Sequence, residues 1–234
     1  MHYQSAANEP TPPFDARAAR SLREGLGMAP GHVAYTMRAS YGLGYVTPDT
    51  ITYWERGQVA PNATELAALA GALWCSAGDL LGDPQTLREH RLALGLAPQD
   101  VALSVGLDVR AYQRMEATGD WRGNERQSTA LADVLGLGPR AFATVTGRDG
   151  QLAGLLRDAV TGVRPQAYVR PVARVVPVPR HELEDALEAM HDDYQGAMAA
   201  TLGWGGASSR QADGAGREFL ERILDEFWSR IREP

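Results

Sequence analysis

The side chains best suited to specific hydrogen bonding occur together in residues 47–57, with the sequence Thr-Pro-Asp-Thr-Ile-Thr-Tyr-Trp-Glu-Arg-Gly. The threonine, tyrosine, aspartate and arginine side chains supply donors and acceptors within a few residues of one another. Groups of this kind contact base edges and phosphate oxygens of DNA. The chemistry that we expect of this stretch is therefore recognition through hydrogen bonds, without a covalent step.

The same stretch has the signals of a short helix. Thr47 suits the N-cap, Pro48 suits the first helical position, and Gly57 suits the C-terminal end. Ile51 and Trp54 are three residues apart, so they share one face that can enter a core. The polar residues then point elsewhere. A short helix with one buried stripe and an outward polar face is what a recognition helix in a DNA major groove requires.

The elements that position this stretch are predicted to be helices as well. Apolar residues follow a helical period in residues 15–27 and 30–38, and a further helix is predicted to start at Pro61. Helices of about ten residues joined by short turns make a compact all-helical domain, in which the second helix packs across the third.

Several short motifs occur in a characteristic order over residues 14 to 82: Leu22-Arg23-Glu24, Ile51, Trp54-Glu55-Arg56-Gly57, Pro61 and Leu66-Ala67-Ala68-Leu69-Ala70. In this order they resemble the XRE (lambda-repressor-like) helix-turn-helix family. The resemblance implies binding to double-stranded DNA, with Glu55 as the structural partner of an arginine in the first helix, either Arg20 or Arg23. Two features depart from the family pattern: a longer turn at residues 39–46, and Pro30-Gly31-His32 in place of a phosphate-contacting glutamine.

We expect two groups of residues in this domain to contact DNA. The first group would contact bases, sugars or phosphates: Thr47, Asp49, Thr50, Thr52 and Tyr53. The second group would lie near the phosphate backbone: His32, Arg38 and Arg56. Asp49 is unusual in such a position, because a carboxylate is repelled by phosphate and accepts only from the amine of cytosine.

An internal repeat predicts a second, degenerate helix-turn-helix domain at residues 85–147. The motif Leu22-Arg-Glu returns as Leu87-Arg-Glu, the motif that begins at Met28 returns at Leu96, and Trp54-Glu55 corresponds to Met115-Glu116. In this copy we expect an N-cap at Asp108, a third helix over residues 109–118 and a fourth over residues 127–135. Outward side chains there are Arg110, Gln113 and Arg114. Two interpretations of this copy stay open. These side chains make a second contact with DNA, or the second copy serves as a scaffold for partner binding or internal packing.

Residues 148–234 are predicted to form a C-terminal helical region. Residues 163–180 are rich in Pro, Arg and Val, so we expect an extended segment that serves as a basic arm on DNA or as a linker. Helices are predicted over residues 151–160, 181–202 and 216–232. The last has a broad apolar face, which predicts either a homodimer through the C-terminal helices or packing within the chain. Residues 1–13 are expected to be a disordered or extended arm.

Composition limits the function classes. A single cysteine, the absence of a long apolar run and an N-terminus unlike a signal peptide favour a cytoplasmic protein without a membrane span. No phosphate-binding loop, nucleophile elbow or His/Cys metal cluster is present, so we expect no enzyme activity, cofactor or metal. The fold class is predicted to be all-α, and the function a sequence-specific transcriptional regulator. The net charge of -6 keeps open a protein-interaction adaptor or antitoxin-like module that binds a protein partner.

Overall fold

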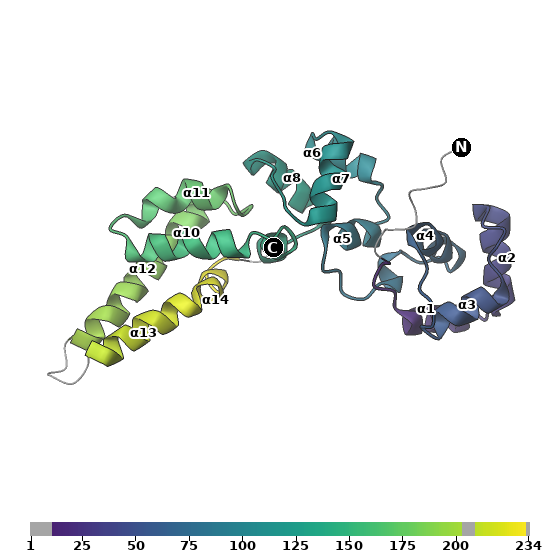
Figure 1. The fold of residues 1–234 in the computed structure, drawn as a ribbon, viewed down its shortest axis with the longest axis horizontal. Helices are drawn as coiled ribbons and strands as arrows, with labels where there is room; N and C mark the ends of the chain where they lie inside the picture. Colours follow the sequence, from purple (N-terminus) through teal and green to yellow (C-terminus); the bar gives the residue numbers. More distant parts are fainter. Residues whose placement is uncertain (1–10, 203–208, 233–234) are drawn as a thin grey trace. The chain divides into compact units, whose positions relative to one another are not determined.

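The computed structural model describes residues 11–202 and 209–232 of the chain (Figure 1). In this part the protein has fourteen α-helices and no strand, so the all-α expectation is confirmed. The helices fall into two compact units, residues 1–100 and residues 101–234. The division lies within α6 (Pro98–Val105). Each unit contains a large hydrophobic core of its own.

The first unit is built on α1 (Ala16–Gly25), α2 (Pro30–Tyr41), α3 (Pro48–Glu55) and α4 (Ala63–Ala72). Helix α2 packs against α3 and α4, and α1 packs against α3. The largest side chains in the core are almost fully buried: Met37, Ile51, Trp54, Leu66, Leu69 and Leu80. The short helix expected around Trp54 therefore forms with its apolar stripe inward.

The chain that precedes α1 is paired with the segment that follows η2 (Gly78–Leu80). Phe14 and Leu81 form an antiparallel bridge, in which the amide of Asp15 donates to the carbonyl of Leu80 at 2.8 Å. Of the predicted N-terminal arm, residues 1–10 lie outside the described residues. Helix α5 (Leu87–Ala93) then packs against η2 within the same unit.

The second unit begins with α7 (Val109–Thr118), α8 (Glu125–Leu135) and α9 (Pro139–Val145). Helix α7 has the predicted bounds and N-cap. Helix α8 starts two residues earlier than predicted because Asn124 caps it with Gln127, and α9 was not predicted at all.

The Pro/Arg-rich segment differs from its predicted extended form. After α10 (Asp149–Thr161) it forms η3 (Pro165–Tyr168) and α11 (Val169–Ala173), so the prediction of an extended segment at 163–180 is wrong. Pro165 and Pro171 both lie in the first turn of a helix, where the missing amide would have no acceptor within the helix. The valines then fill the core of the second unit: Val169, Val172, Val175, Val176 and Val178.

Three helices complete the second unit: α12 (Arg180–Leu202), α13 (Ser209–Glu221) and α14 (Ile223–Trp228). The predicted single helix over 216–232 is instead two helices that meet at Arg222. In Figure 1, α13 runs beside α12. The side chains of Ile223, Phe227 and Ile231 are buried in the core of the same chain. The other four residues of the predicted apolar face are partly buried against the same core: Phe219, Leu220, Leu224 and Trp228. Packing within the chain thus accounts for part of this face, and the homodimer stays a prediction.

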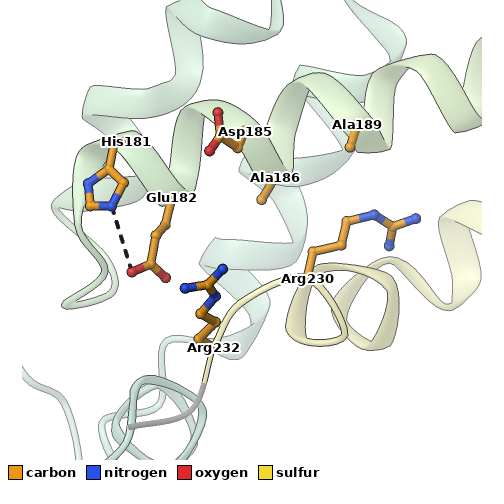
Figure 2. A pocket seen from close by; sticks show the side chains of 7 residues that line it. All are labelled: His181, Glu182, Asp185, Ala186, Ala189, Arg230 and Arg232. Atoms are coloured by element: carbon orange, nitrogen blue, oxygen red, sulfur yellow. Dashed lines mark ion pairs between the residues drawn. The ribbon is translucent and has the colours of Figure 1, made fainter.

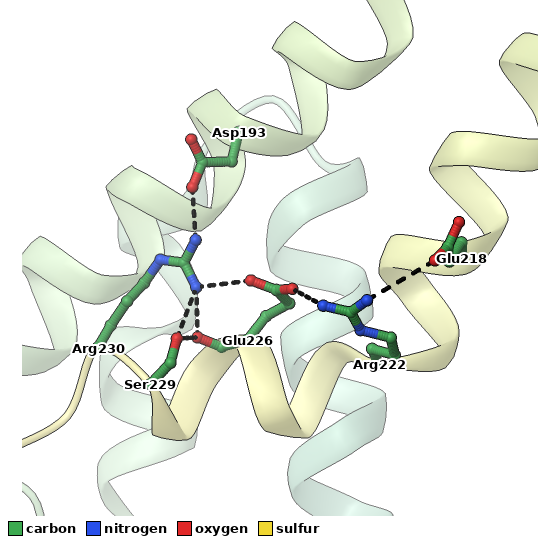
Figure 3. A network of polar contacts seen from close by, with 6 residues as sticks. All are labelled: Asp193, Glu218, Arg222, Glu226, Ser229 and Arg230. Atoms are coloured by element: carbon green, nitrogen blue, oxygen red, sulfur yellow. Dashed lines mark hydrogen bonds and ion pairs between the residues drawn. The ribbon is translucent and has the colours of Figure 1, made fainter.

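Polar contacts fix these C-terminal helices (Figure 3). Arg230 joins Asp193 of α12 at 2.5 Å to Glu226 at 3.0 Å, and Arg222 joins Glu226 at 2.9 Å to Glu218 at 3.6 Å. Of these four contacts, the one with Asp193 joins segments that are distant in the sequence. It holds the residues just after α14 on α12.

Candidate nucleic-acid interface

Helix α3 is held by its N-terminal cap and by an ion pair at its C-terminal end. The hydroxyl of Thr47 accepts from the amide of Thr50 at 3.2 Å, and the hydroxyl of Thr50 accepts from the amide of Thr47 at the same distance. At the other end, Arg23 of α1 donates from Nε and Nη2 to the two carboxylate oxygens of Glu55, at 2.5 and 2.7 Å. The cap therefore closes the N-terminus of α3, and the ion pair anchors its C-terminal end to α1.

The partner of Glu55 is Arg23 and not Arg20, which pairs with Glu24 on the surface. A third guanidinium nitrogen of Arg23 donates to the carbonyl of Met28 at 2.7 Å, and only 8% of the residue is exposed. The hydrogen bonds to Glu55 raise the pKa of Arg23, because they stabilise the charged guanidinium. The pair thus joins α1, the turn after it and α3.

The outward face of α3 carries the residues predicted from the sequence. Asp49, Tyr53 and Arg56 are exposed, with 48% of Tyr53 accessible, whereas Thr50 and Thr52 are half-buried. The hydroxyl of Thr52 donates to the carbonyl of Pro48 at 3.0 Å. Because a hydroxyl oxygen keeps acceptor capacity while it donates, these threonines can still accept a hydrogen bond from a base or a water.

The two residues expected near the phosphate backbone from α2 both have partners within the protein. Nη1 of Arg38 donates to the carbonyl of Val46 at 2.7 Å and so closes the turn between α2 and α3. Nδ1 of His32 accepts from the amide of Ala29 at 3.2 Å and completes the cap of α2. The ring of His32 remains exposed, and Arg38 is half-buried.

The long turn before α3 rests on α4. The hydroxyl of Tyr45 donates to Glu65 at 2.9 Å. The hydroxyl of Tyr41 lies over Gly71, where an added Cβ would be 1.9 Å from that oxygen. Gly42 has a φ of 70°, which a glycine adopts without strain. The sequence showed these two tyrosines, but it did not indicate that α4 would hold the turn through both of them.

Local structure in the first four helices recurs in α5 to α8. Arg91, 6% exposed, donates to the carbonyl of Leu96 at 2.8 Å, as Arg23 does to the carbonyl of Met28. A capping box of Asn124 with Gln127 likewise repeats that of Asn62 with Glu65. The counterpart of Arg23 is thus Arg91, although the sequence motif pointed to Arg88. The Leu-Arg-Glu motif was misleading. The number of residues between an arginine and the turn after its helix decides whether it reaches the carbonyl in that turn, and the leucine before it does not.

Helix α7 presents the second set of predicted residues. Arg110, Gln113 and Arg114 are exposed, while Tyr112 is fully buried. Asp108 caps the helix by accepting from the amides of Arg110 and Ala111, at 3.0 and 3.1 Å. The helix thus has a fixed inner face and a free outer face, which is the same division that α3 has.

A buried arginine that the sequence did not indicate supports the loop after α7. Arg148 is 8% exposed, and its guanidinium donates to the carbonyls of Trp121 and Gly123 at 3.2 and 3.1 Å. It also donates to the carbonyls of Arg174 and Val175, at 3.0 and 2.9 Å. Burial lowers the pKa of Arg148, since the charge is removed from water. Nothing in its sequence context, between Gly147 and Asp149, signals burial.

A pocket of about 280 Å³ lies between the start of α12 and the end of the chain (Figure 2). Two carboxylates, Glu182 and Asp185, and two guanidinium groups, Arg230 and Arg232, are among its lining groups. The opposite charges balance, so the pocket favours neither an anion nor a cation. Within the described residues, no group of three or more His, Cys, Asp and Glu side chains is placed to hold a metal ion.

Two further findings describe the chain as a whole. None of the described helices is both long and apolar enough to cross a bilayer. Comparison of the chain with family models, with curated proteins and with solved structures finds no match in any of the three.

Proposed function

We propose that the protein is a sequence-specific DNA-binding regulator of transcription, and that α3 enters the major groove. One observation carries this proposal. Helix α3 is fixed on one side by Ile51, Trp54 and the pair between Arg23 and Glu55, and on the other side it exposes polar side chains. A rigid short helix with one free polar face has the form that groove recognition needs.

The charge on α3 limits how it would bind. Arg56 adds one positive charge to its exposed face, and Asp49 adds one negative charge. A carboxylate in the groove can accept a hydrogen bond from cytosine, but it weakens attraction to phosphate. Base contacts by Asp49 and Tyr53 would therefore contribute selectivity, while α3 alone would contribute little non-specific affinity.

The test is selection of bound duplexes from a random pool, followed by binding measurements on the selected site. Replacing Thr52→Ala together with Tyr53→Ala is expected to weaken binding to that site about tenfold or more, since base-edge contacts contribute about 1–3 kcal/mol each. Helical content, followed by circular dichroism, should stay the same. Trp74→Ala is the control, because Trp74 is an aromatic residue after α4 that is 82% exposed and is not among the residues expected to contact DNA.

The selected sequences also report the geometry of binding. An inverted repeat would indicate a twofold dimer, and two unequal half-sites would indicate that one chain uses both of its repeats. A pool without any enriched sequence would contradict the proposal.

A protein-interaction adaptor is the second candidate, and exposed apolar side chains favour it. Trp74 and Leu103 are each 82% exposed. Salt separates the two functions, because DNA affinity falls steeply as counterions compete for the phosphates, whereas contact through apolar residues changes little. Binding measured over a range of salt concentrations decides between them.

A further inference from the structure

We infer that α7 is a second base-reading helix, and that the reading of guanine depends on α7 more than on α3. This inference rests on the proposed DNA-binding function and adds how that function is divided within the chain. It reverses the ranking that the sequence suggests, because the second repeat has lost the tryptophan of the first and is degenerate by motif.

The exposed residues of α7 form one continuous stripe. They occupy positions i, i+3, i+4, i+7 and i+8 of the helix: Arg110, Gln113, Arg114, Ala117 and Thr118. Residues at this spacing lie on a single helical face. The long hydrogen-bonding side chains occupy the N-terminal half of the face, and small side chains occupy the other half. A groove can therefore approach the helix closely.

No carboxylate belongs to this stripe. Glu116 is half-buried and accepts from the hydroxyl of Tyr112 at 3.1 Å. Asp120, which follows the helix, accepts from Nη2 of Arg122 at 2.6 Å, so its charge is compensated. Asp108 is exposed as well, but it precedes α7 and its carboxylate accepts from the amides of Arg110 and Ala111. The stripe itself therefore carries two arginines and no acid, whereas the exposed face of α3 carries Asp49.

The chemistry of the stripe fits the major groove of DNA. Arginine donates two parallel hydrogen bonds to O6 and N7 of guanine, and glutamine pairs with N6 and N7 of adenine. The exposed residues of α3 carry hydroxyl or carboxylate groups, which cannot donate two parallel hydrogen bonds. The exception is Arg56, at the C-terminal end of the helix. Guanine contacts are thus expected mainly from Arg110 and Arg114.

The support behind α7 is rigid enough for base reading. Tyr112 is fully buried, and the chain after the helix is held by the buried indole of Trp121, whose Nε1 donates to the hydroxyl of Ser128 at 2.9 Å. Arg148 binds two carbonyls of the same loop. An added Cβ on Gly123 would lie 2.4 Å from the indole ring, so the loop has little room to shift.

The test compares the DNA motifs that are selected by the unmodified protein, by two variants of α7 and by Tyr53→Ala. Arg110→Ala with Arg114→Ala should remove guanine from one part of the motif, leave the other part unchanged, and weaken binding to the best site about tenfold or more. Arg114→Lys should retain most of the non-specific affinity but lose guanine preference, since a point charge cannot donate the parallel pair. Arg164→Ala with Arg170→Ala, which removes two exposed arginines elsewhere in the second unit, is the matched control for the loss of two charges.

The outcomes separate this inference from the proposed function. If the unmodified protein enriches no sequence, the DNA-binding function itself fails, and the inference with it. If the protein selects a motif that is the same after Arg110→Ala with Arg114→Ala, the DNA-binding function stands and the role of α7 is overturned. If guanine is lost only after Tyr53→Ala, α3 is the reader and the inference is again overturned.

Discussion

At the scale of single residues, the pair between Arg23 and Glu55 is the contact on which α3 depends. The side chains of both residues are about nine-tenths buried, with exposures of 10% and 9%. A buried charge that loses its partner is costly, because it has been taken out of water without compensation. The guanidinium of Arg23 also donates a hydrogen bond to the carbonyl of Met28.

We predict that Arg23→Met lowers the free energy of unfolding by about 3 kcal/mol, because it leaves the carboxylate of Glu55 buried without its partner. Denaturation by urea, followed by tryptophan fluorescence, measures the change. Arg20→Met is the matched control, since its pair with Glu24 is exposed to solvent and its loss should leave the free energy of unfolding close to that of the unmodified protein. Equal losses in the two variants would contradict the assigned role of Arg23.

Residue-level prediction from the sequence succeeded where a local signal existed. Ile51 and Trp54 were assigned to the core from their spacing, and both are buried. The resemblance left Arg20 and Arg23 as alternative partners of Glu55, because both residues occur in the first helix. Only the fold decides between them, since the choice depends on which side of α1 faces α3.

At the scale of elements, caps and periodicity predicted much of the helical structure. Thr47 and Asp108 cap the helices expected to follow them. The error at 163–180 has a physical reason, because four prolines argue against one long helix but allow short helices that start near a proline. The valines are buried against α10 and α12, the helices on either side of this segment, so the composition of residues 163–180 by itself gave no sign of their burial.

The loop between α7 and α8 is the element whose structure depends most on a distant residue. Arg148 is placed at the N-cap of α10 and donates to carbonyls both in this loop and in the segment after α11. Carbonyl oxygens surround the charge of the Arg148 guanidinium, and none of these acceptors is a carboxylate. The planar guanidinium of Arg148 thus joins the start of α10, the loop between α7 and α8, and the segment after α11.

We predict that Arg148→Lys destabilises the protein by about 2–3 kcal/mol, because one ammonium cannot reach both sets of carbonyls and leaves some of them unsatisfied. Equilibrium unfolding in urea gives the value. The same change at Arg170, which is exposed on α11, should have an effect within about 0.5 kcal/mol. A tolerated lysine at position 148 would show that the fork geometry of the guanidinium is not needed.

At the scale of the whole molecule, one helix face carries a cluster of negative charge. The exposed side of α12 carries acidic residues at helical spacing: Glu184, Asp185, Glu188, Asp192 and Asp193. By contrast, the stripe on α7 carries two arginines and no acid. A chain with a net charge of -6 can therefore present a positive surface locally.

We predict that this acidic face suppresses non-specific DNA binding and does not affect which sequence is chosen. Neutralising Glu184→Gln, Glu188→Gln and Asp192→Asn should raise affinity for random duplex several-fold at low salt, because repulsion between the protein and phosphate is reduced. The gain should fade as ionic strength approaches about 1 M, where screening acts over roughly 3 Å. A control that keeps the charge, with Glu184→Asp, Glu188→Asp and Asp192→Glu, should bind as the unmodified protein does. Unchanged non-specific affinity at low salt, or an altered selected motif, would show that the acidic face has another role.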